Sequence, residues 1–435
     1  MNRFIKRVKG FLKHYLHTSL TKVANIYVLN PLFVVVQSFA FMFLLSADRN
    51  RKNLGALQAR PTVGSLLYGC IGMFFNLNHL GSVYLISPNR LNISSRMERE
   101  VIEWVKHLFR VKDKNVEGYV SSGGTESNLF AMWSLRDYML KKKPSKICVI
   151  VSPLTHYSIL KAARILNIEI IYTPLNLKSW SMDPILLKKT IMKVIRRGVA
   201  NIMIPVTLGY PSTGTCDSLP DIDSILSAID KKYSKARCVI WADAAAQGLP
   251  IAYLNRHFEP FKYKHLYAIG TDFHKLGNAP IPSSIVLFRK QLRVAIQTKI
   301  SYLAESDVTI GGSRPGFIAM GMWANMRSGS HISRQKDFYR SEQIKNYFIR
   351  QFISYFPKKN IIHTRYSMTC AIIVDQDFRK LPTPVEEKYS LYLGSIVIDS
   401  NQNTLRHYKI HFMTDISQKI IDEFMNDMTL YQKSV

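Results

Sequence analysis

A lysine that could bond covalently to a carbonyl compound follows a histidine in the run Thr271-Asp-Phe-His274-Lys275-Leu-Gly277. The apolar stretch Leu266–Gly270 before it is typical of a buried strand. In α/β proteins, sites are built at the ends of such strands. A buried lysine loses its proton more easily than one in water, and its amine can then form a Schiff base. Most lysines are solvated surface charges, so this hypothesis depends on other segments of the chain.

The glycine-rich turn Gly118-Tyr-Val-Ser-Ser-Gly123-Gly124-Thr125-Glu-Ser-Asn128 precedes the helical stretch Leu129–Leu140. Two glycines at a strand-to-helix turn let backbone N–H groups converge on an anion, and the helix N-terminus adds the positive end of its dipole. Thr125 could cap the helix and donate its hydroxyl group. The alternative is a capping turn that binds no ligand.

A histidine and an aspartate also lie at predicted strand ends. His156 precedes the helical stretch Ile159–Leu166, where it could stack on a flat ring or bond to the backbone. Asp243 closes the apolar strand Cys238–Ala242, and a buried aspartate is costly unless a group such as a protonated ring nitrogen pairs with it. The alternative for Asp243 is a helix N-cap.

These segments together offer a phosphate site, a ring-stacking histidine, an acid for a ring nitrogen and a Schiff-base lysine. Pyridoxal 5′-phosphate needs all four. The turn-rich loop Gly311–Gly316 follows and carries one fixed cation, Arg314. The sequence therefore predicts pyridoxal 5′-phosphate as the cofactor and a small amine or amino acid as the substrate.

The elements that must position these residues alternate short apolar runs with helix-length segments from about residue 116. Uniformly apolar runs of this kind indicate a mostly parallel sheet covered on both faces, and so an α/β fold. The predicted strands are Val116–Ser121, Ile147–Ser152, Ile168–Tyr172, Asn201–Leu208, Cys238–Ala242, Leu266–Gly270 and Ser284–Phe288.

The order of elements changes after about residue 330. Apolar strands at Cys370–Val374, Ser390–Ile398 and His407–Phe412 precede a helix from about Asp415 to Tyr431. This pattern is typical of a smaller α+β domain. We therefore expect an N-terminal segment over 1–55, a large cofactor-binding domain over 56–328 and a small C-terminal domain over 329–435.

Composition limits the class of protein. With 435 residues and 47% apolar content, the chain is long enough for one large and one smaller domain. The five cysteines are scattered without metal-binding spacing, so we expect no metal site and a reducing, cytoplasmic location. The formal net charge of +29 favours contact with anionic surfaces or reflects a general lysine bias, and no compact nucleic-acid motif is present.

Two features of the N-terminal segment point to a membrane. Residues 3–17 place apolar side chains at helical spacing among basic ones, as in helices that lie on membrane surfaces. The uncharged run Pro31–Ala47 is just shorter than a usual membrane span. Membrane contact through residues 1–47 and an apolar arm packed across a dimer partner both stay open.

The chain resembles the pyridoxal-phosphate-dependent group II decarboxylases, which have the aspartate-aminotransferase-type fold (fold type I). The resemblance runs from about residue 60 to about 430 and is carried by Gly118–Asn128, Asp243-Ala-Ala245 and His274-Lys275. Asn76–Gly81 and Met97–Ile102 are similar to bacterial histidine decarboxylases, and Asp272–Pro282 to archaeal tyrosine/aspartate decarboxylases. Gly124–Ser127, Gly312–Gly316 and Trp323–Met326 are similar to sphingosine-1-phosphate lyases, which also have an N-terminal membrane segment. These motifs are specific for cofactor and fold, and poorly specific for substrate.

The resemblance implies a role for each matching residue. Lys275 would hold the cofactor as a Schiff base, and Asp243 would pair with its ring nitrogen. His156 would stack on one face of the ring and Ala245 would pack on the other. The phosphate would be surrounded by Gly123, Gly124, Thr125 and His274.

Two more residues and the oligomeric state follow from the resemblance alone. Ser313 would reach a phosphate across a dimer interface, and Tyr302 would donate a proton after bond cleavage. Because family members are homodimers, we expect a homodimer. The chain departs from many decarboxylases in having Asp272 three residues before the lysine, and a carboxylate near a phosphate must be screened or point away.

Three functions fit these features. The first is decarboxylation of an L-amino acid of the histidine, aromatic or aspartate type. The second is a lyase similar to sphingosine-1-phosphate lyase, which cleaves Cα–Cβ and releases an aldehyde. The third is a non-catalytic protein that keeps the fold to bind a membrane or a partner. The segment before the phosphate turn and the short chain favour the first.

Overall fold

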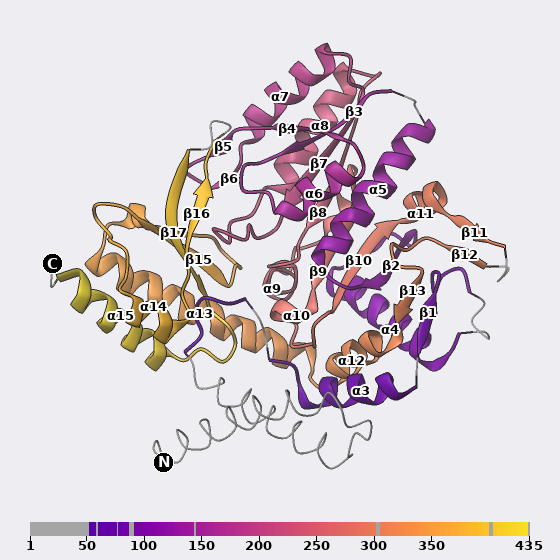
Figure 1. Ribbon diagram of the computed structural model, residues 1–435. Helices are drawn as coiled ribbons and strands as arrows, with labels where there is room; N and C mark the ends of the chain where they lie inside the picture. The colour runs from indigo at the N-terminus through magenta and orange to yellow at the C-terminus, as the bar shows by residue number, and fades with distance from the viewer. Residues whose placement is uncertain are drawn as a thin grey trace, which may run out of the picture. The chain divides into compact units, whose positions relative to one another are not determined.

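A seven-stranded, mostly parallel sheet forms the centre of the fold, as the sequence predicts (Figure 1). Its strand order is β2-β10-β9-β8-β7-β3-β4, and of these seven β10 alone runs antiparallel to its neighbours. The strands are β2 (Val116–Ser121), β3 (Ile147–Val151), β4 (Glu169–Tyr172), β7 (Asn201–Thr207), β8 (Arg237–Asp243), β9 (Leu266–Asp272) and β10 (Ser284–Arg289). All seven predicted strands are confirmed, and their ends differ from the prediction by two residues or fewer.

The computed structural model describes residues 52–57, 60–75, 77–86, 91–142, 145–301, 305–399 and 403–433. The predictions for residues 3–17 and 31–47, and that for Tyr302, lie outside these ranges. Within them, no helix is both long enough and apolar enough to cross a membrane.

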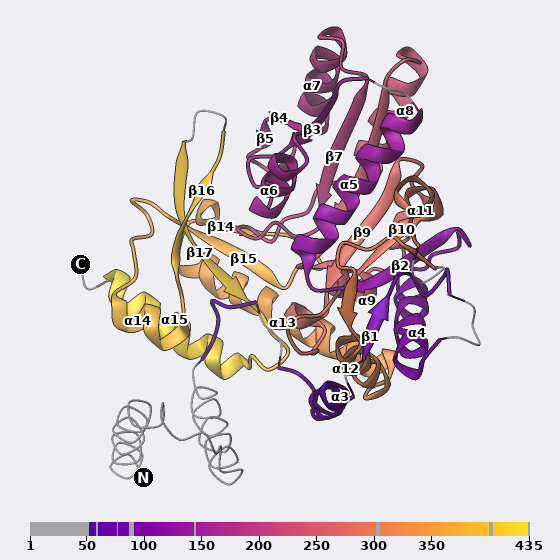
Figure 2. The same cartoon turned by 45° about the vertical axis from the view of Figure 1, so that its right-hand side comes forward.

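Helices cover both faces of the sheet (Figures 1 and 2). On one face lie α4 (Ile93–Leu108), α7 (Pro184–Arg196), α8 (Leu219–Lys232) and α9 (Gly248–Leu254). On the other lie α5 (Gly124–Lys142), α6 (Tyr157–Ile165) and α11 (Lys290–Ile296). Successive strand residues point to opposite faces, so in β7 Ile204 joins the first core and Met203 the second. Burial on both sides explains why the strands are uniformly apolar.

The C-terminal part contains an antiparallel sheet of order β14-β15-β17-β16. Its strands are β14 (Ile361–His363), β15 (Thr369–Val374), β16 (Leu393–Val397) and β17 (Thr404–His411). The predicted helix is α15 (Gln418–Lys433). The prediction that a strand begins at Ser390 is wrong, because Ser390 has a left-handed φ of 54° and ends α14 (Thr383–Tyr389).

Two elements of this part are not among the predicted ones. The strand β14 is only three residues long and gives no periodic signal. The helix α13 (His331–Tyr355) buries Phe338, Phe348 and Phe352 at helical spacing, a pattern that was present in the sequence.

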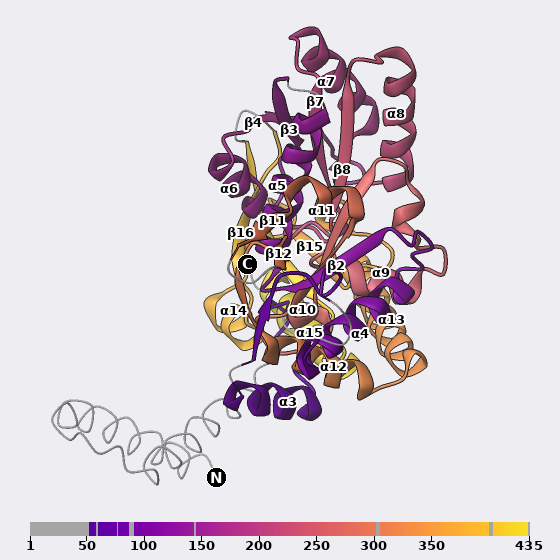
Figure 3. The same ribbon diagram turned by 90° about the vertical axis from the view of Figure 1, so that its right-hand side faces the viewer.

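At the open edge of β2, a short strand pair and two helices complete this part of the fold (Figure 1; Figure 3 shows the helices from the side). The strand β1 (Asn78–Leu80) pairs with β13 (Ser313–Pro315) and places His79 opposite Arg314. The helix α3 (Val63–Phe74) packs on α12 (Gly316–Arg327), which also contacts α4. Residues far apart in the sequence thus meet beside the strand that leads to the glycine-rich turn.

Candidate active site

A cavity of about 320 Å³ opens at the carboxyl ends of β2, β3, β7, β8 and β9. Eight predicted site residues line it: Gly123, Gly124, Thr125, His156, Asp243, Ala245, His274 and Lys275. Parallel strands end at one edge, which is why residues from five separate segments meet there. The lining also includes Ser122, Glu126, Asn128 and Asp272, which were not among the predicted site residues. The individual roles of all these residues remain predictions.

The turn after β2 has the form of an anion site. The helix α5 begins at Gly124, so its N-terminal N–H groups and the positive end of its dipole face the cavity. A Cβ atom at residue 124 would lie 2.8 Å from the Cβ atom of Ala245, which explains why glycine is required there. The prediction that Thr125 caps the helix is wrong, because Thr125 is the second residue of α5.

Glu126, in the first turn of α5, stabilises the glycine-rich turn. Its Oε2 accepts from the backbone N–H of Ser122 at 2.8 Å and from the Ser122 hydroxyl at 2.7 Å. Its Oε1 accepts from the Tyr119 hydroxyl at 3.0 Å. Burial and the neighbouring Glu126 raise the pKa of Tyr119, so the phenol keeps the proton that it donates. A glutamate near the start of a helix is a capping signal that could have been found in the sequence.

Asn128 connects three side chains behind the cavity. Its amide nitrogen donates to Oδ2 of Asp243 at 2.9 Å and to Oγ of Ser158 at 3.1 Å, while its oxygen accepts from Nε1 of Trp241 at 3.0 Å. The other oxygen of Asp243 accepts from the N–H of Ala245 at 3.2 Å. Asp243 is not a helix N-cap, because the N-cap of α9 is Gln247.

The carboxylate of Asp243 therefore has only neutral donors among the described residues, although the residue is 7% exposed. A buried carboxylate is stabilised best by a positive charge. The position is suited to a protonated ring nitrogen of a ligand in the cavity.

His156 is the N-cap of α6 and lies over the cavity. Its Nδ1 accepts from the N–H of Ser158 at 3.3 Å and lies 2.7 Å from the Ser158 hydroxyl. Burial lowers the pKa of His156, Asp243 opposes that effect, and Lys275 adds to it. The ring is thus fixed as a neutral imidazole with its proton on Nε2, and Asn128 holds it in place through Ser158.

Lys275 and His274 are in α10 (Phe273–Leu276), directly after β9. Nζ of Lys275 lies 2.9 Å from Oδ2 of Asp272, and Nδ1 of His274 lies 2.8 Å from the carbonyl oxygen and 3.2 Å from the backbone nitrogen of Ser283. The Asp272 carboxylate does not point away from the turn, since both oxygens would lie 3.4 Å from a Cβ atom at residue 124. It is screened by Lys275, and its Oδ1 has no hydrogen-bond partner among the described residues.

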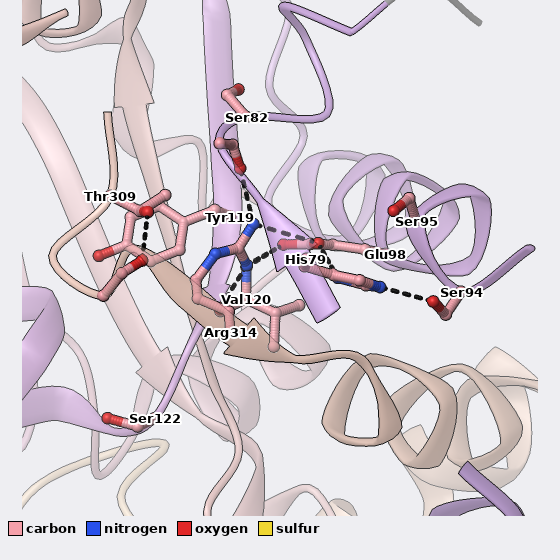
Figure 4. Close-up of polar contacts among 12 residues, drawn as sticks. His79, Ser82, Ser94, Ser95, Glu98, Tyr119, Val120, Ser122, Thr309 and Arg314 are labelled. Atoms are coloured by element: carbon pink, nitrogen blue, oxygen red, sulfur yellow. Dashed lines mark hydrogen bonds and ion pairs between the residues drawn. The ribbon is translucent and has the colours of Figure 1, made fainter. Parts of the chain in front are cut away.

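The open edge of β2 is closed by a buried ion pair (Figure 4). The N–H of Val120 donates to Oε1 of Glu98 at 2.9 Å, and Nη1 of Arg314 donates to the carbonyl of Val120 at 3.0 Å. Nη1 also lies 2.6 Å from Oε1 of Glu98, and Nη2 donates to the carbonyl of Gly81 at 2.9 Å. We call this pair the Glu98–Arg314 clamp. Because the backbone groups of an edge strand need partners, the clamp fixes the strand that leads into the turn.

His79 adds a third side chain to the clamp (Figure 4). Its Nδ1 lies 2.6 Å from Oε2 of Glu98, and its Nε2 lies 2.7 Å from Oγ of Ser94. The Ser94 hydroxyl also donates to Oδ1 of Asn92 at 2.9 Å, which connects His79 to the N-cap of α4. Burial by itself raises the pKa of Glu98, but Arg314 and His79 outweigh it and hold that pKa at about 2.

One predicted site residue lies elsewhere. Ser313 is exposed on β13, where its hydroxyl accepts from the amide of Asn78 at 3.1 Å, and it does not line the cavity of its own chain. The prediction that it reaches a phosphate concerns the site of a dimer partner and stays a prediction.

Comparisons with known proteins bear on this site. The pyridoxal-dependent decarboxylase conserved domain matches residues 76–349. A histidine decarboxylase from Vibrio anguillarum is 27% identical over 281 residues, which cover 64% of this chain and 69% of that protein. A tryptophan decarboxylase from Clostridium sporogenes is 27% identical over 369 residues, which cover 82% of this chain and 84% of that protein.

Solved structures share the fold at low sequence identity. The L-methionine decarboxylase from Streptomyces sp. 590, in complex with L-methionine methyl ester, superposes with a TM-score of 0.77 at 16% identity, covering 91% of this chain and 94% of that one. The Catharanthus roseus tryptophan decarboxylase in complex with L-tryptophan gives a TM-score of 0.73 at 16% identity, with 100% and 99% covered. These likenesses confirm the predicted fold type I architecture.

Proposed function

Since the chain belongs to the pyridoxal-dependent decarboxylase family, we propose that it removes the carboxyl group of an L-amino acid with an imidazole or aromatic side chain. The observation that carries the proposal is the buried Asp243 carboxylate, which has no cation partner among the described residues and lines the same cavity as the Lys275 amine. An acid for a ring nitrogen, an amine for an aldehyde and an anion-binding turn fit pyridoxal 5′-phosphate.

Each of these residues has a separable task. Pyridoxal 5′-phosphate, when bound, supplies a ring that accepts the electron pair left on Cα as carbon dioxide departs. Lys275 would hold the cofactor through its amine. Asp243 would keep a proton on the ring nitrogen. The turn at Gly123 and Gly124 would bind the phosphate with its backbone N–H groups.

The neutral His156, held by Ser158, would cover one face of the ring and keep water from that face. Ala245, beside the turn, would pack on the other face. The way in which these residues orient the substrate carboxyl group would select decarboxylation over other reactions at Cα.

The residues at the mouth of the cavity favour a substrate with an imidazole or aromatic side chain. Tyr157, Pro211 and Ile281 line it and are exposed. Among the lining residues that the structure describes, Lys275 is the only lysine or arginine. A second carboxylate, such as that of aspartate, would therefore lack a fixed cation, so the aspartate option is disfavoured.

Two further features belong to the proposal. A homodimer is expected from the resemblance, and exposed apolar residues on α3, among them Val63 and Leu67, offer a surface for a partner. A cytoplasmic location is supported by five free cysteines, since no disulfide is formed.

The experiment is an absorbance spectrum of the purified protein, followed by turnover with histidine, tryptophan, tyrosine, aspartate and a phosphosphingoid base. We expect a visible band from the bound cofactor and carbon dioxide from histidine or an aromatic amino acid. The Lys275→Ala variant should lose both the band and turnover. Release of an aldehyde without carbon dioxide would establish the lyase alternative, and failure to bind the cofactor the non-catalytic one. Turnover of aspartate alone would contradict the inference about the side chain.

A further inference from the structure

The amino-terminal ends of three central strands, opposite the cavity, carry a concentration of positive charge that the proposed reaction does not use. The strands β3, β7 and β8 begin side by side there, because Ile147 pairs with Asn201 and Asn201 with Arg237. One end of the sheet therefore gathers the segments that lead into these strands and the C-terminal ends of α5, α7 and α8 (Figures 1 and 2).

We define the basic surface as the exposed lysines and arginines of residues 141–146, 188–197 and 231–235. Among the described residues, these segments contain three, five and three exposed cations respectively, and none of the segments contains an aspartate or glutamate. Two carboxylates beside these segments form ion pairs: Glu169 lies 2.8 Å from Arg197 of the surface itself, and Asp230 lies 2.5 Å from Lys264. Because the three segments contain no acidic residue of their own, the surface keeps a net positive charge.

Helix dipoles explain only part of this arrangement. Cations stabilise the last turn of a helix, which accounts for Lys142, Arg196 and Lys232. Lys188 and Lys189 lie in the middle of α7, and Lys146 lies in the loop before β3. Other exposed helices mix charges: α13, for example, carries Asp337 and Glu342 among its cations.

We propose that the basic surface binds the anionic headgroups of a phospholipid bilayer. The cationic residues are mostly lysines, whose flexible ammonium groups suit a fluid layer of phosphates, whereas nucleic-acid recognition favours arginine and stacking aromatic residues. The sequence provides a second signal of the same kind in the basic, amphipathic stretch 3–17. Stable attachment to a membrane surface generally needs two such signals.

A membrane bound at the basic surface would leave the cavity accessible. Strands of five to seven residues separate the basic surface from the cavity, which corresponds to about 20 Å at ~3.3 Å per residue. A bilayer at the amino-terminal ends of the strands therefore leaves the cavity at their carboxyl ends open to a small substrate.

The test uses the full chain and a variant in which four exposed α7 cations, none of them in an ion pair with another described residue, are replaced by glutamine: Lys188→Gln, Lys189→Gln, Lys193→Gln and Arg196→Gln. Glutamine has nearly the helix propensity of lysine, so α7 should remain folded. The matched control removes the same charge elsewhere through Lys336→Gln, Arg340→Gln, Arg350→Gln and Lys419→Gln, all at exposed positions.

Binding is measured by cosedimentation with vesicles of mixed phosphatidylcholine and phosphatidylserine, and with vesicles of phosphatidylcholine alone. We expect salt-sensitive binding to the mixed vesicles only. Each cation near an anionic membrane strengthens binding about fivefold, so the α7 variant should bind at least about 100-fold more weakly, with turnover in solution unchanged. The control variant should bind much more tightly than the α7 variant.

Three outcomes would overturn the proposal. One is no binding of the wild-type chain to the mixed vesicles. Another is an equal loss in the control variant, which would mean that only net charge matters. The last is tighter binding to random-sequence duplex DNA or RNA than to the mixed vesicles at the same salt concentration, which would assign the surface to nucleic acid.

Discussion

Removing the cation of the Glu98–Arg314 clamp should destabilise the protein and loosen the glycine-rich turn. In the Arg314→Met variant, the Glu98 carboxylate, which is 0% exposed, keeps only His79 and one backbone N–H as partners. Breaking a buried ion pair on one side costs about 3–5 kcal/mol. The carbonyls of Gly81 and Val120 also lose their donors, at about 1–3 kcal/mol each when no water replaces them. We expect a loss of at least about 4 kcal/mol in the free energy of unfolding.

The assay is urea denaturation followed by tryptophan fluorescence, in a double-mutant cycle with Glu98→Leu. The double variant should regain about 2 kcal/mol relative to Arg314→Met, because the isolated buried charge is gone. The clamp also holds β2, so the Kd for pyridoxal 5′-phosphate, measured by absorbance titration, should rise at least about tenfold in Arg314→Met. Additive single effects, or a cost below about 1 kcal/mol, would refute the reasoning.

The clamp also makes the free energy of unfolding depend on pH. The pKa of Glu98 falls from 4.5 to about 2 in the folded protein, which corresponds to about 3 kcal/mol of stability. Because the folded pKa is the lower one, this stability is present above about pH 5 and is lost as pH falls toward 2. The difference in unfolding free energy between wild type and Glu98→Gln should shrink over that range, and a constant difference would contradict the assignment.

Three other substitutions test the cavity and the C-terminal sheet. Gly124→Ala places a Cβ atom 2.8 Å from that of Ala245, so cofactor affinity should fall at least about tenfold. The control Gly64→Ala, which has open space around it, should leave cofactor affinity unchanged. An equal loss in both variants would argue against the glycine-rich turn as the phosphate site. Asp243→Asn keeps its hydrogen bond with Asn128 but loses its charge, so kcat should fall about 100-fold or more with little change in melting temperature; an unchanged kcat would remove Asp243 from the mechanism. His407 is buried with neither ring nitrogen hydrogen-bonded among the described residues, and burial lowers its pKa from 6.5 to about 4. Because only the unfolded chain is protonated at pH 5, His407→Leu should stabilise the protein by about 2 kcal/mol more at pH 5 than at pH 8 in urea denaturation; a gain that does not depend on pH would show that the buried ring is not neutral.

The sequence by itself determined the strands and the residues at their carboxyl ends. Apolar runs such as Asn201–Leu208 and the paired glycines at 123 and 124 are local signals, because burial of a strand and the geometry of a turn depend on neighbouring residues. Parallel strands end at one edge, so placing each strand also brought His156, Asp243 and Lys275 to one cavity.

Only the tertiary structure decided what supports those residues. Glu98 and Arg314 are 216 positions apart, and Asn128 joins Asp243 from 115 positions away. Nothing local marks such residues as partners, since a lone charged or amide side chain is usually solvated. They pair because the fold buries them together, where an unpaired polar group is costly, and that burial is a property of the assembled core.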